Sequence, residues 1–108
     1  MSSIAAPVFV KYNDSVRTNE EAGVKLVCEA WGYPEITKPI EWKFENRSEL
    51  PLGVNVTNSQ TNPGYSELVI KSANNSHRGV YSCHVENSVG SNEVPIMVRI
   101  KGDFLSHL

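Results

Sequence analysis

The sequence predicts an all-β protein, a sandwich of two antiparallel sheets built from about seven to eight short strands. Three observations lead to this prediction. Short runs alternate apolar and polar residues, turn-forming residues recur about every eight to twelve positions, and no window of about eleven or more residues has a helical period. With 108 residues, of which 40% are hydrophobic and 20% charged, the chain has the size and composition of one folded domain.

The strands can be placed from this alternation and from the turns between them. We expect strands at residues 7–10, 24–30, 40–44, 54–56, 65–70, 80–86 and 93–101. Pro7 favours a sheet edge for the first of these strands. Residues 18–23 are turn-rich, residues 31–39 are predicted to form a loop because they contain one glycine and two prolines, and residues 87–90 form a tight hairpin turn.

Within each predicted strand, alternate residues form an apolar face that points toward the core. This face consists of Val24, Leu26 and Cys28; Ile40, Trp42 and Phe44; Leu68 and Ile70; Tyr81, Cys83 and Val85; and Val94, Ile96, Val98 and Ile100. Ala73 is expected to join the same core after a turn. Both cysteines therefore face inward, as buried thiols or as a disulfide. A metal site is not expected, because the chain has no C-x-x-C and its three histidines, His77, His84 and His107, are not at ligand spacing.

An ordered set of motifs covers nearly the whole chain. Cys28 is followed fourteen residues later by Trp42, and then by Tyr81-Ser82-Cys83. Around this frame lie Gly23-x-x-Leu26-x-Cys28, Ala30-x-Gly32-x-Pro34, Pro39-x-x-Trp42, Leu68-x-Ile70, Gly79-x-Tyr81-x-Cys83 and Asn87-x-x-Gly90. In this order the motifs resemble those of the immunoglobulin superfamily, and within it those of the intermediate (I-set) type.

The resemblance implies a role for each signature residue and a set of boundaries. Cys28 and Cys83 would be bonded, with Cα atoms about 5.5–6 Å apart, and Trp42 would pack against the bridge beside Leu68. The Tyr81 hydroxyl would bond backbone a few residues upstream, as a tyrosine corner. The immunoglobulin-like domain would span residues 7–101, with residues 1–6 as a leader or cloning remnant and residues 102–108 as a linker or tail.

Two departures from the family pattern are informative. The family usually carries an aspartate two residues before the glycine at position 79, whereas this chain has His77, so the ion pair made by that aspartate must be missing or replaced. The segment between Gly32 and Trp42 is also longer than usual, which makes the loop at one end of the sandwich a candidate for recognition.

Trp31 and Tyr33 are the candidate partner-binding residues in that loop. Because Cys28 and Ala30 point inward, alternation makes Trp31 point outward at the mouth of the loop. Exposed aromatic side chains at such positions are typical interface anchors. The alternative is that Trp31 folds back over the end of the sandwich as a lid on the core.

Several functional classes are excluded at this stage. A net charge of −2 with scattered basic residues does not favour nucleic-acid binding, and no apolar run is long enough to span a membrane. The chain has no nucleophile motif, no glycine-rich phosphate loop and no paired acids, and His77 and His84 are expected to be exposed surface residues. We therefore expect no enzyme activity, no cofactor, no metal and no direct membrane contact from this segment.

Four Asn-x-Ser/Thr sequons bear on the cellular compartment. They begin at Asn13, Asn46, Asn55 and Asn74, and all fall in predicted loops or at strand ends where a glycan would have room. Together with an inward-facing cysteine pair, they favour the secretory route and an extracellular location.

Two functions follow from this sequence. The first is a non-catalytic recognition module of a cell-adhesion molecule or receptor ectodomain, which binds a protein partner homophilically or heterophilically. The alternative is a structural or docking repeat of an intracellular muscle or cytoskeletal protein; a remote third option is an accessory domain beside a catalytic domain.

The final strand is expected to lie at a sheet edge. Pro95, Arg99 and Lys101 discourage pairing along this edge, so a monomer is expected in isolation.

Overall fold

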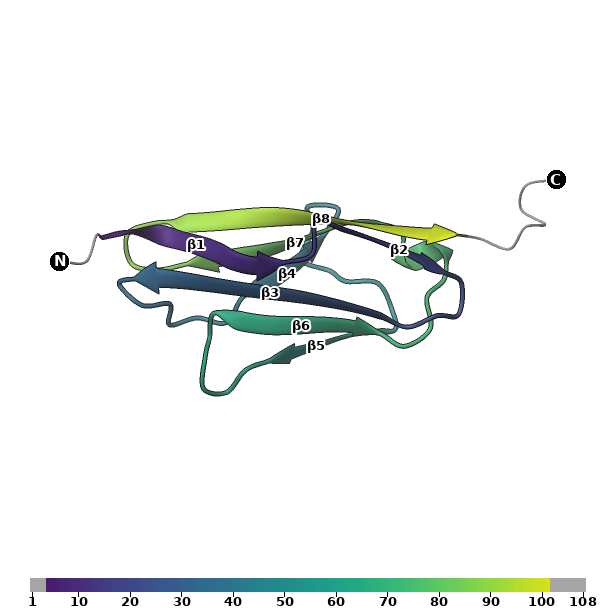
Figure 1. Ribbon diagram of the computed structural model, residues 1–108, viewed down its shortest axis with the longest axis horizontal. Coiled ribbons are helices and arrows are strands. Elements are labelled where there is room, and N and C mark those ends of the chain that lie inside the picture. Colours follow the sequence, from purple (N-terminus) through teal and green to yellow (C-terminus); the bar gives the residue numbers. More distant parts are fainter. Residues whose placement is uncertain (1–3, 102–108) are drawn as a thin grey trace.

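A computed structural model of the protein describes residues 4–101 and shows eight strands and one short 3₁₀ helix (Figure 1). The elements are β1 (Ala5–Tyr12), β2 (Ser15–Asn19), β3 (Val24–Tyr33), β4 (Glu41–Phe44), β5 (Val54–Asn58), β6 (Tyr65–Ile70), η1 (Asn75–His77), β7 (Gly79–Glu86) and β8 (Ser91–Lys101). The tail expected at residues 102–108, the first three residues of the expected leader and His107 lie outside the described residues. β1 begins inside the segment that was expected to be a leader.

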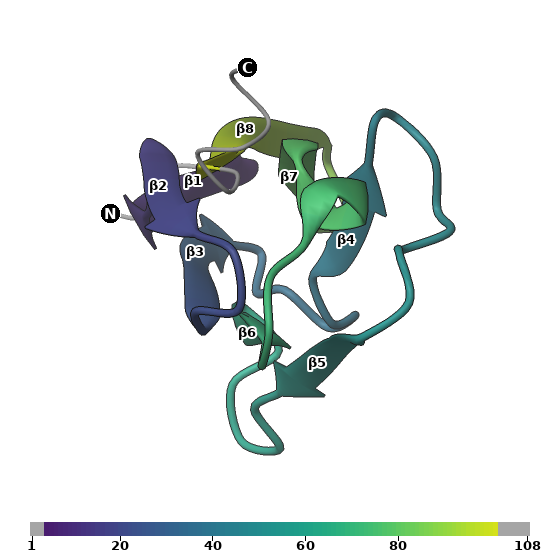
Figure 2. The ribbon, with the colours of Figure 1, turned by 90° about the vertical axis from the view of Figure 1, so that its right-hand side faces the viewer.

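The strands form two four-stranded sheets that pack face to face (Figure 2). One sheet has the order β1-β3-β6-β5 and the other has the order β2-β8-β7-β4. All neighbours are antiparallel except β2 and β8, which run parallel. The predicted all-β sandwich is confirmed.

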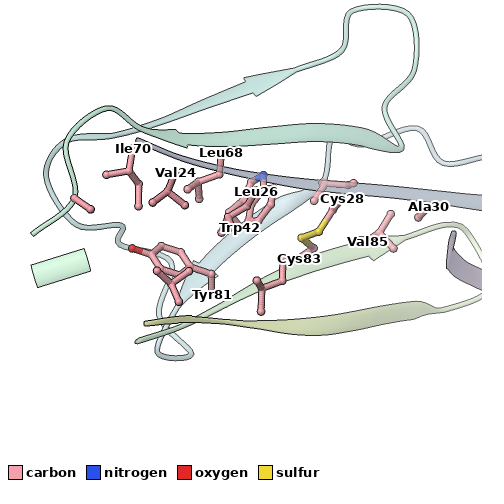
Figure 3. Close-up of a cluster of buried hydrophobic side chains, with 14 of the residues drawn as sticks. Val24, Leu26, Cys28, Ala30, Trp42, Leu68, Ile70, Tyr81, Cys83 and Val85 are labelled. Atoms are coloured by element: carbon pink, nitrogen blue, oxygen red, sulfur yellow. A yellow bond between two sulfur atoms is a disulfide. The ribbon is translucent and has the colours of Figure 1, made fainter. Parts of the chain in front are cut away.

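The core between the sheets consists of the inward faces of the strands (Figure 3). Its buried hydrophobic residues are Val24, Leu26, Cys28, Ala30, Ile36, Ile40, Trp42, Leu68, Ile70, Ala73, Tyr81, Cys83, Val85, Ile96, Val98 and Ile100. A disulfide joins Cys28 on β3 to Cys83 on β7, and therefore links the two sheets. Their Cα atoms are 6.5 Å apart, slightly more than the expected distance and within the range that disulfides span.

Polar atoms in this core are paired. The indole N–H of Trp42 donates to the Ser66 hydroxyl at 2.8 Å, and that hydroxyl donates to the side-chain oxygen of Asn58 at 2.7 Å. The Tyr81 hydroxyl donates to the His77 carbonyl at 2.8 Å, which is the tyrosine corner. Buried polar groups need such partners, because leaving one unpaired costs about 1–3 kcal/mol.

The sequence did not predict β2, and this changes the place of the last strand. Residues 15–19 pair in register with residues 97–101 of β8, so this half of β8 has a strand partner on the side that was expected to be free. The expectation that residues 93–101 form a free edge is wrong for this half. Arg99 and Lys101 therefore pair with β2, whereas Pro95 lies in the half of β8 that β2 does not cover.

Candidate functional site

The candidate site is the outer face of the β1–β3 pair. Trp31 lies directly opposite Val8, and Tyr33 lies opposite Ala5, so these side chains share the face that points away from the core. Trp31 is 65% exposed and Tyr33 is 58% exposed. Trp31 is therefore not a lid on the core, and the alternative prediction is wrong.

The two aromatic residues lie on a strand rather than on a loop. β3 continues to Tyr33 because β1 supplies a partner for this part of the backbone, which corrects the prediction of a loop from residue 31. The connection to β4 comprises residues 34–40 and is held to the body of the domain. Ile36 and Ile40 are buried, and the side-chain amide of Asn87 donates to the Pro34 carbonyl at 2.8 Å.

The apolar patch extends beyond the two predicted residues. Val8 is 59% exposed and shares this face, because it lies opposite Trp31, whereas the exposed Tyr12 lies opposite the inward-facing Cys28 and does not belong to the patch. Sequence reasoning did not identify Val8 as a neighbour of Trp31, because the register between two strands far apart in the chain is not visible in either strand alone.

Charged and polar groups border the patch. The Trp31 indole N–H lies 3.4 Å from a Glu29 carboxylate oxygen, and Glu29 lies opposite Lys11 on one side and Tyr65 on the other. Farther along the face, the Tyr65 hydroxyl donates to Glu67 at 2.7 Å. This hydrogen bond lowers the pKa of the Glu67 carboxyl and raises the pKa of Tyr65. The arrangement is an exposed aromatic centre with a polar border, which is the usual anatomy of a protein-binding surface.

The other sheet carries a charged network on its outer face. His84 Nδ1 lies 3.2 Å from a Glu93 carboxylate oxygen, and the Lys43 ammonium lies 3.4 Å from the same oxygen. Partial burial raises the pKa of Glu93, but the hydrogen bonds and charges of His84 and Lys43 outweigh it and leave that pKa below its ordinary value. The His84 side chain is only 24% exposed, so the prediction of a freely exposed surface histidine is wrong.

His77 also departs from its prediction, because it is buried with 2% exposure. Its Nδ1 accepts a hydrogen bond from the Asn74 backbone N–H at 3.0 Å, so Nε2 carries the proton and donates to the Leu52 carbonyl at 2.7 Å. The histidine therefore caps η1 and ties it to the connection before β5. At position 77 the family usually has an aspartate that forms an ion pair. In this chain the His77 side chain forms a capping hydrogen bond instead.

The four sequon asparagines differ in their surroundings. Asn46, Asn55 and Asn74 are exposed, whereas Asn13 is half-buried and its side-chain oxygen accepts a hydrogen bond from the Val27 N–H at 2.8 Å. The Asn74 side-chain oxygen caps η1 and accepts from Ser76. Asn55 lies within β5, and Asn46 lies in the turn after β4.

Among residues 4–101 no three His, Cys, Asp or Glu side chains are grouped in a way that could hold a metal ion. In the same part of the chain no helix has the length and hydropathy needed to span a membrane.

Comparison with known proteins agrees with this fold. The family model for the immunoglobulin I-set domain matches residues 7–100. The chain belongs to the immunoglobulin I-set family. Human hemicentin-1 is 33% identical to this I-set domain over 84 residues, which are 78% of this chain and 1% of hemicentin-1. The muscle M-line assembly protein unc-89 of Caenorhabditis elegans is 26% identical over 91% of this chain and 1% of its own length.

Solved structures show the same fold. A chimeric titin Z1Z2 structure superposes with a TM-score of 0.79 at 21% identity, covering 94% of this I-set domain and all of that chain. Titin domains Z1Z2 in complex with telethonin give a TM-score of 0.76 at 22% identity, covering 94% of this chain and 49% of that one. The I-set domain thus spans about one hundredth of the curated relatives it matches, and its likeness to titin concerns the fold.

Proposed function

We propose that this I-set domain is a non-catalytic protein-recognition module of an adhesion molecule or receptor ectodomain, with Trp31 and Tyr33 as its binding anchors. The observation that carries the proposal is the exposed apolar patch on the outer face of β1 and β3. A Trp side chain that is 65% exposed and faces an exposed Val8 across the strands is costly to leave in water. Covering it would stabilise a complex by about 2–3 kcal/mol.

The shape of the patch supports a protein rather than a small molecule as partner. The anchors lie on paired strands, so binding them orders little backbone, and the acidic and basic groups beside them can form a polar rim. The partner is a protein, either a second copy of the same molecule or a different ligand. A solved structure of titin domains in complex with telethonin shows that a related fold can engage a protein partner.

The extracellular placement rests on two features of the domain. The disulfide is buried between the sheets, and three of the four sequon asparagines are exposed. Disulfides persist in secreted and cell-surface proteins, and sequons are modified in the secretory pathway.

An intracellular docking repeat is the second candidate, favoured by the likeness to a muscle M-line assembly protein over 91% of the chain. The two candidates differ in the state of Cys28 and Cys83 in the protein taken from its natural source. Thiol labelling followed by mass measurement, with and without reductant, separates them. A disulfide supports the extracellular module, and two free thiols support the intracellular repeat.

Binding is tested by applying a multimer of the domain to an array of secreted ectodomains. The array includes the same domain, so that self-binding is also detected. For any ectodomain that binds in this array, Trp31→Ala should raise the dissociation constant by about thirtyfold or more. The reason is that truncating an anchor typically costs at least about 2 kcal/mol of binding free energy. The Tm should stay nearly unchanged. Leu52→Ala is the matched control, since Leu52 is 92% exposed in the connection before β5 and its backbone is bonded to His77 of η1 rather than to β1 or β3. Equal binding by wild type, Trp31→Ala and Leu52→Ala would contradict the proposal.

A further inference from the structure

The four sheet edges of the domain are not protected in the same way. An edge strand presents unpaired N–H and C=O groups to other chains, and proteins protect such strands with charge, proline, bulges or short length. In this fold the edge strands are β1 and β5 in one sheet and β2 and β4 in the other. Figure 1 shows β5 as the outermost strand of its sheet.

Three of these edges carry recognisable protection. β1 contains Pro7 and Lys11, and its register with β3 shifts twice. β2 carries Arg17 at its centre, and the four-residue β4 carries Glu41 and Lys43.

β5 has neither charge, proline nor a bulge, and only its length of five residues limits pairing. Its sequence, Val54-Asn55-Val56-Thr57-Asn58, contains no charge and no proline, and all five residues pair with β6 without a register shift. Val56 is exposed on this strand, and Leu52 just before it is 92% exposed. By composition and geometry, β5 is a straight, neutral edge that another strand could extend.

This strand instead contains a sequon. Asn55 lies opposite Val69, whereas the inward Leu68 and Ile70 lie opposite Val56 and Val54. Asn55 and Thr57 therefore point to the outer face, and both are exposed. Among the hydrogen bonds of residues 4–101, none uses the Asn55 side chain, in contrast to those of Asn13 and Asn74.

We propose that Asn55 is an N-glycosylation site and that its glycan protects the free β5 edge from pairing with a second copy of the domain. The inference rests on the extracellular half of the proposed function, because the modification needs the secretory route. A glycan on Asn55 leaves the outer face directly beside the free backbone groups of β5, and its bulk hinders the approach of another strand. Pairing of two bare β5 strands would form a two-fold dimer with a continuous sheet.

The experiment uses the full chain secreted from cultured mammalian cells behind an added signal peptide. Site occupancy is mapped by enzymatic deglycosylation and peptide mass spectrometry, and self-association is measured by sedimentation velocity over a concentration series. We expect Asn55 to be occupied and the glycosylated protein to be monomeric. Asn55→Gln should instead sediment faster as concentration rises, toward about twice the monomer mass.

Three variants control this result. Thr57→Ala removes the sequon and keeps Asn55, so it should self-associate as Asn55→Gln does, and it replaces that variant if Asn55→Gln fails to fold. Asn55→Lys also removes the glycan but restores charge to the edge, so it should be monomeric. Asn46→Gln removes a sequon outside β5 and should also leave the monomer unchanged.

Two results would overturn the inference. One is an unmodified Asn55 in protein that carries a glycan at Asn46, and the other is a glycan-free Asn55→Gln or Thr57→Ala that stays monomeric at every concentration. The results that would overturn the proposed function are different from these two. Free thiols and four unmodified sequons in protein from its natural source would remove the extracellular placement, and unchanged binding by Trp31→Ala would remove the anchor.

Discussion

Single polar atoms fix how the large side chains of this sandwich lie. Trp42 reaches Ser66 on the opposite sheet, so the biggest core side chain is oriented by a hydrogen bond as well as by packing. Asn87 acts similarly at the surface. Its amide donates to the carbonyls of Ala5 and Pro34, and its oxygen accepts from the Val89 N–H within the hairpin turn. One asparagine therefore holds together the start of β1, the β3–β4 connection and the β7–β8 turn.

Tyr81 gives a prediction at this scale about stability in alkali. Burial raises the pKa of its hydroxyl to about 12, from an ordinary value of 10.0. The folded state then keeps the proton that the unfolded chain releases, so this contribution is complete below pH 10 and is lost as the pH rises toward about 12. Over this range the wild type should lose about 2 kcal/mol of unfolding free energy relative to Tyr81→Phe.

Urea denaturation of both proteins across that pH range measures the difference. Tyr81→Phe is the necessary reference because lysines and the other tyrosines titrate in both proteins. At neutral pH the phenylalanine variant should be less stable by about 1 kcal/mol, because the hydrogen bond to the His77 carbonyl is lost. If the difference in unfolding free energy between the two proteins does not change with pH, the Tyr81 hydroxyl is not buried in its neutral form as described.

At the scale of elements, the contacts between strands are close enough that a single added carbon atom matters. Gly64, just before β6, accepts a hydrogen bond from the Ala30 N–H at 2.7 Å and so ties the β5–β6 connection to β3. A Cβ at Gly64 would overlap the carbonyl oxygen of Ala30. Backbone atoms of a paired strand cannot move aside without breaking that pairing.

Gly64→Ala should therefore lower the unfolding free energy by about 1–3 kcal/mol, the usual cost of overpacking. Gly23→Ala is the matched control. The atoms nearest to a Cβ there are the Lys71 carbonyl oxygen at 3.7 Å and the Ile70 carbonyl oxygen at 3.8 Å, which are ordinary contacts. It should be neutral or stabilising by up to about 1 kcal/mol. Chemical denaturation measures both, and equal stability of the two variants would show that the approach at Gly64 is not as close as described.

At the scale of the whole molecule, the fold is a rod-like unit whose described chain enters and leaves at opposite ends (Figure 1). β1 starts at one end and β8 finishes at the other. The exposed apolar patch on β1 and β3 and the free edge of β5 belong to the same sheet, whereas the His84 network belongs to the other. The two sheets therefore present different chemistry to their surroundings.

The disulfide is the covalent link between these sheets, and its loss tests the stability of the whole domain. It spans 55 positions of sequence, so it restricts the unfolded chain strongly. Reduction should lower the unfolding free energy by about 2–5 kcal/mol, measured by denaturation with and without reductant. The double variant Cys28→Ala with Cys83→Ala should lose stability in the same range and should not respond to reductant. A wild type that keeps its stability after thiol titration has shown full reduction would contradict this account.

The amino-acid sequence by itself was sufficient to predict the inward faces of β3, β4, β6, β7 and β8, and its resemblance to the I-set family predicted the pairing of the cysteines and the places of Trp42 and Tyr81. These features depend on period-two alternation and on motif spacing, which are properties of neighbouring residues. Tertiary structure decided what depends on segments far apart in the chain. β2 exists because β8 offers it a partner, β3 extends to Tyr33 because β1 pairs with it, and the faces of Val8 and Asn55 follow from register. His77 is buried because the Leu52 carbonyl supplies a hydrogen-bond acceptor from another loop, and no local pattern in the sequence encodes such a partner.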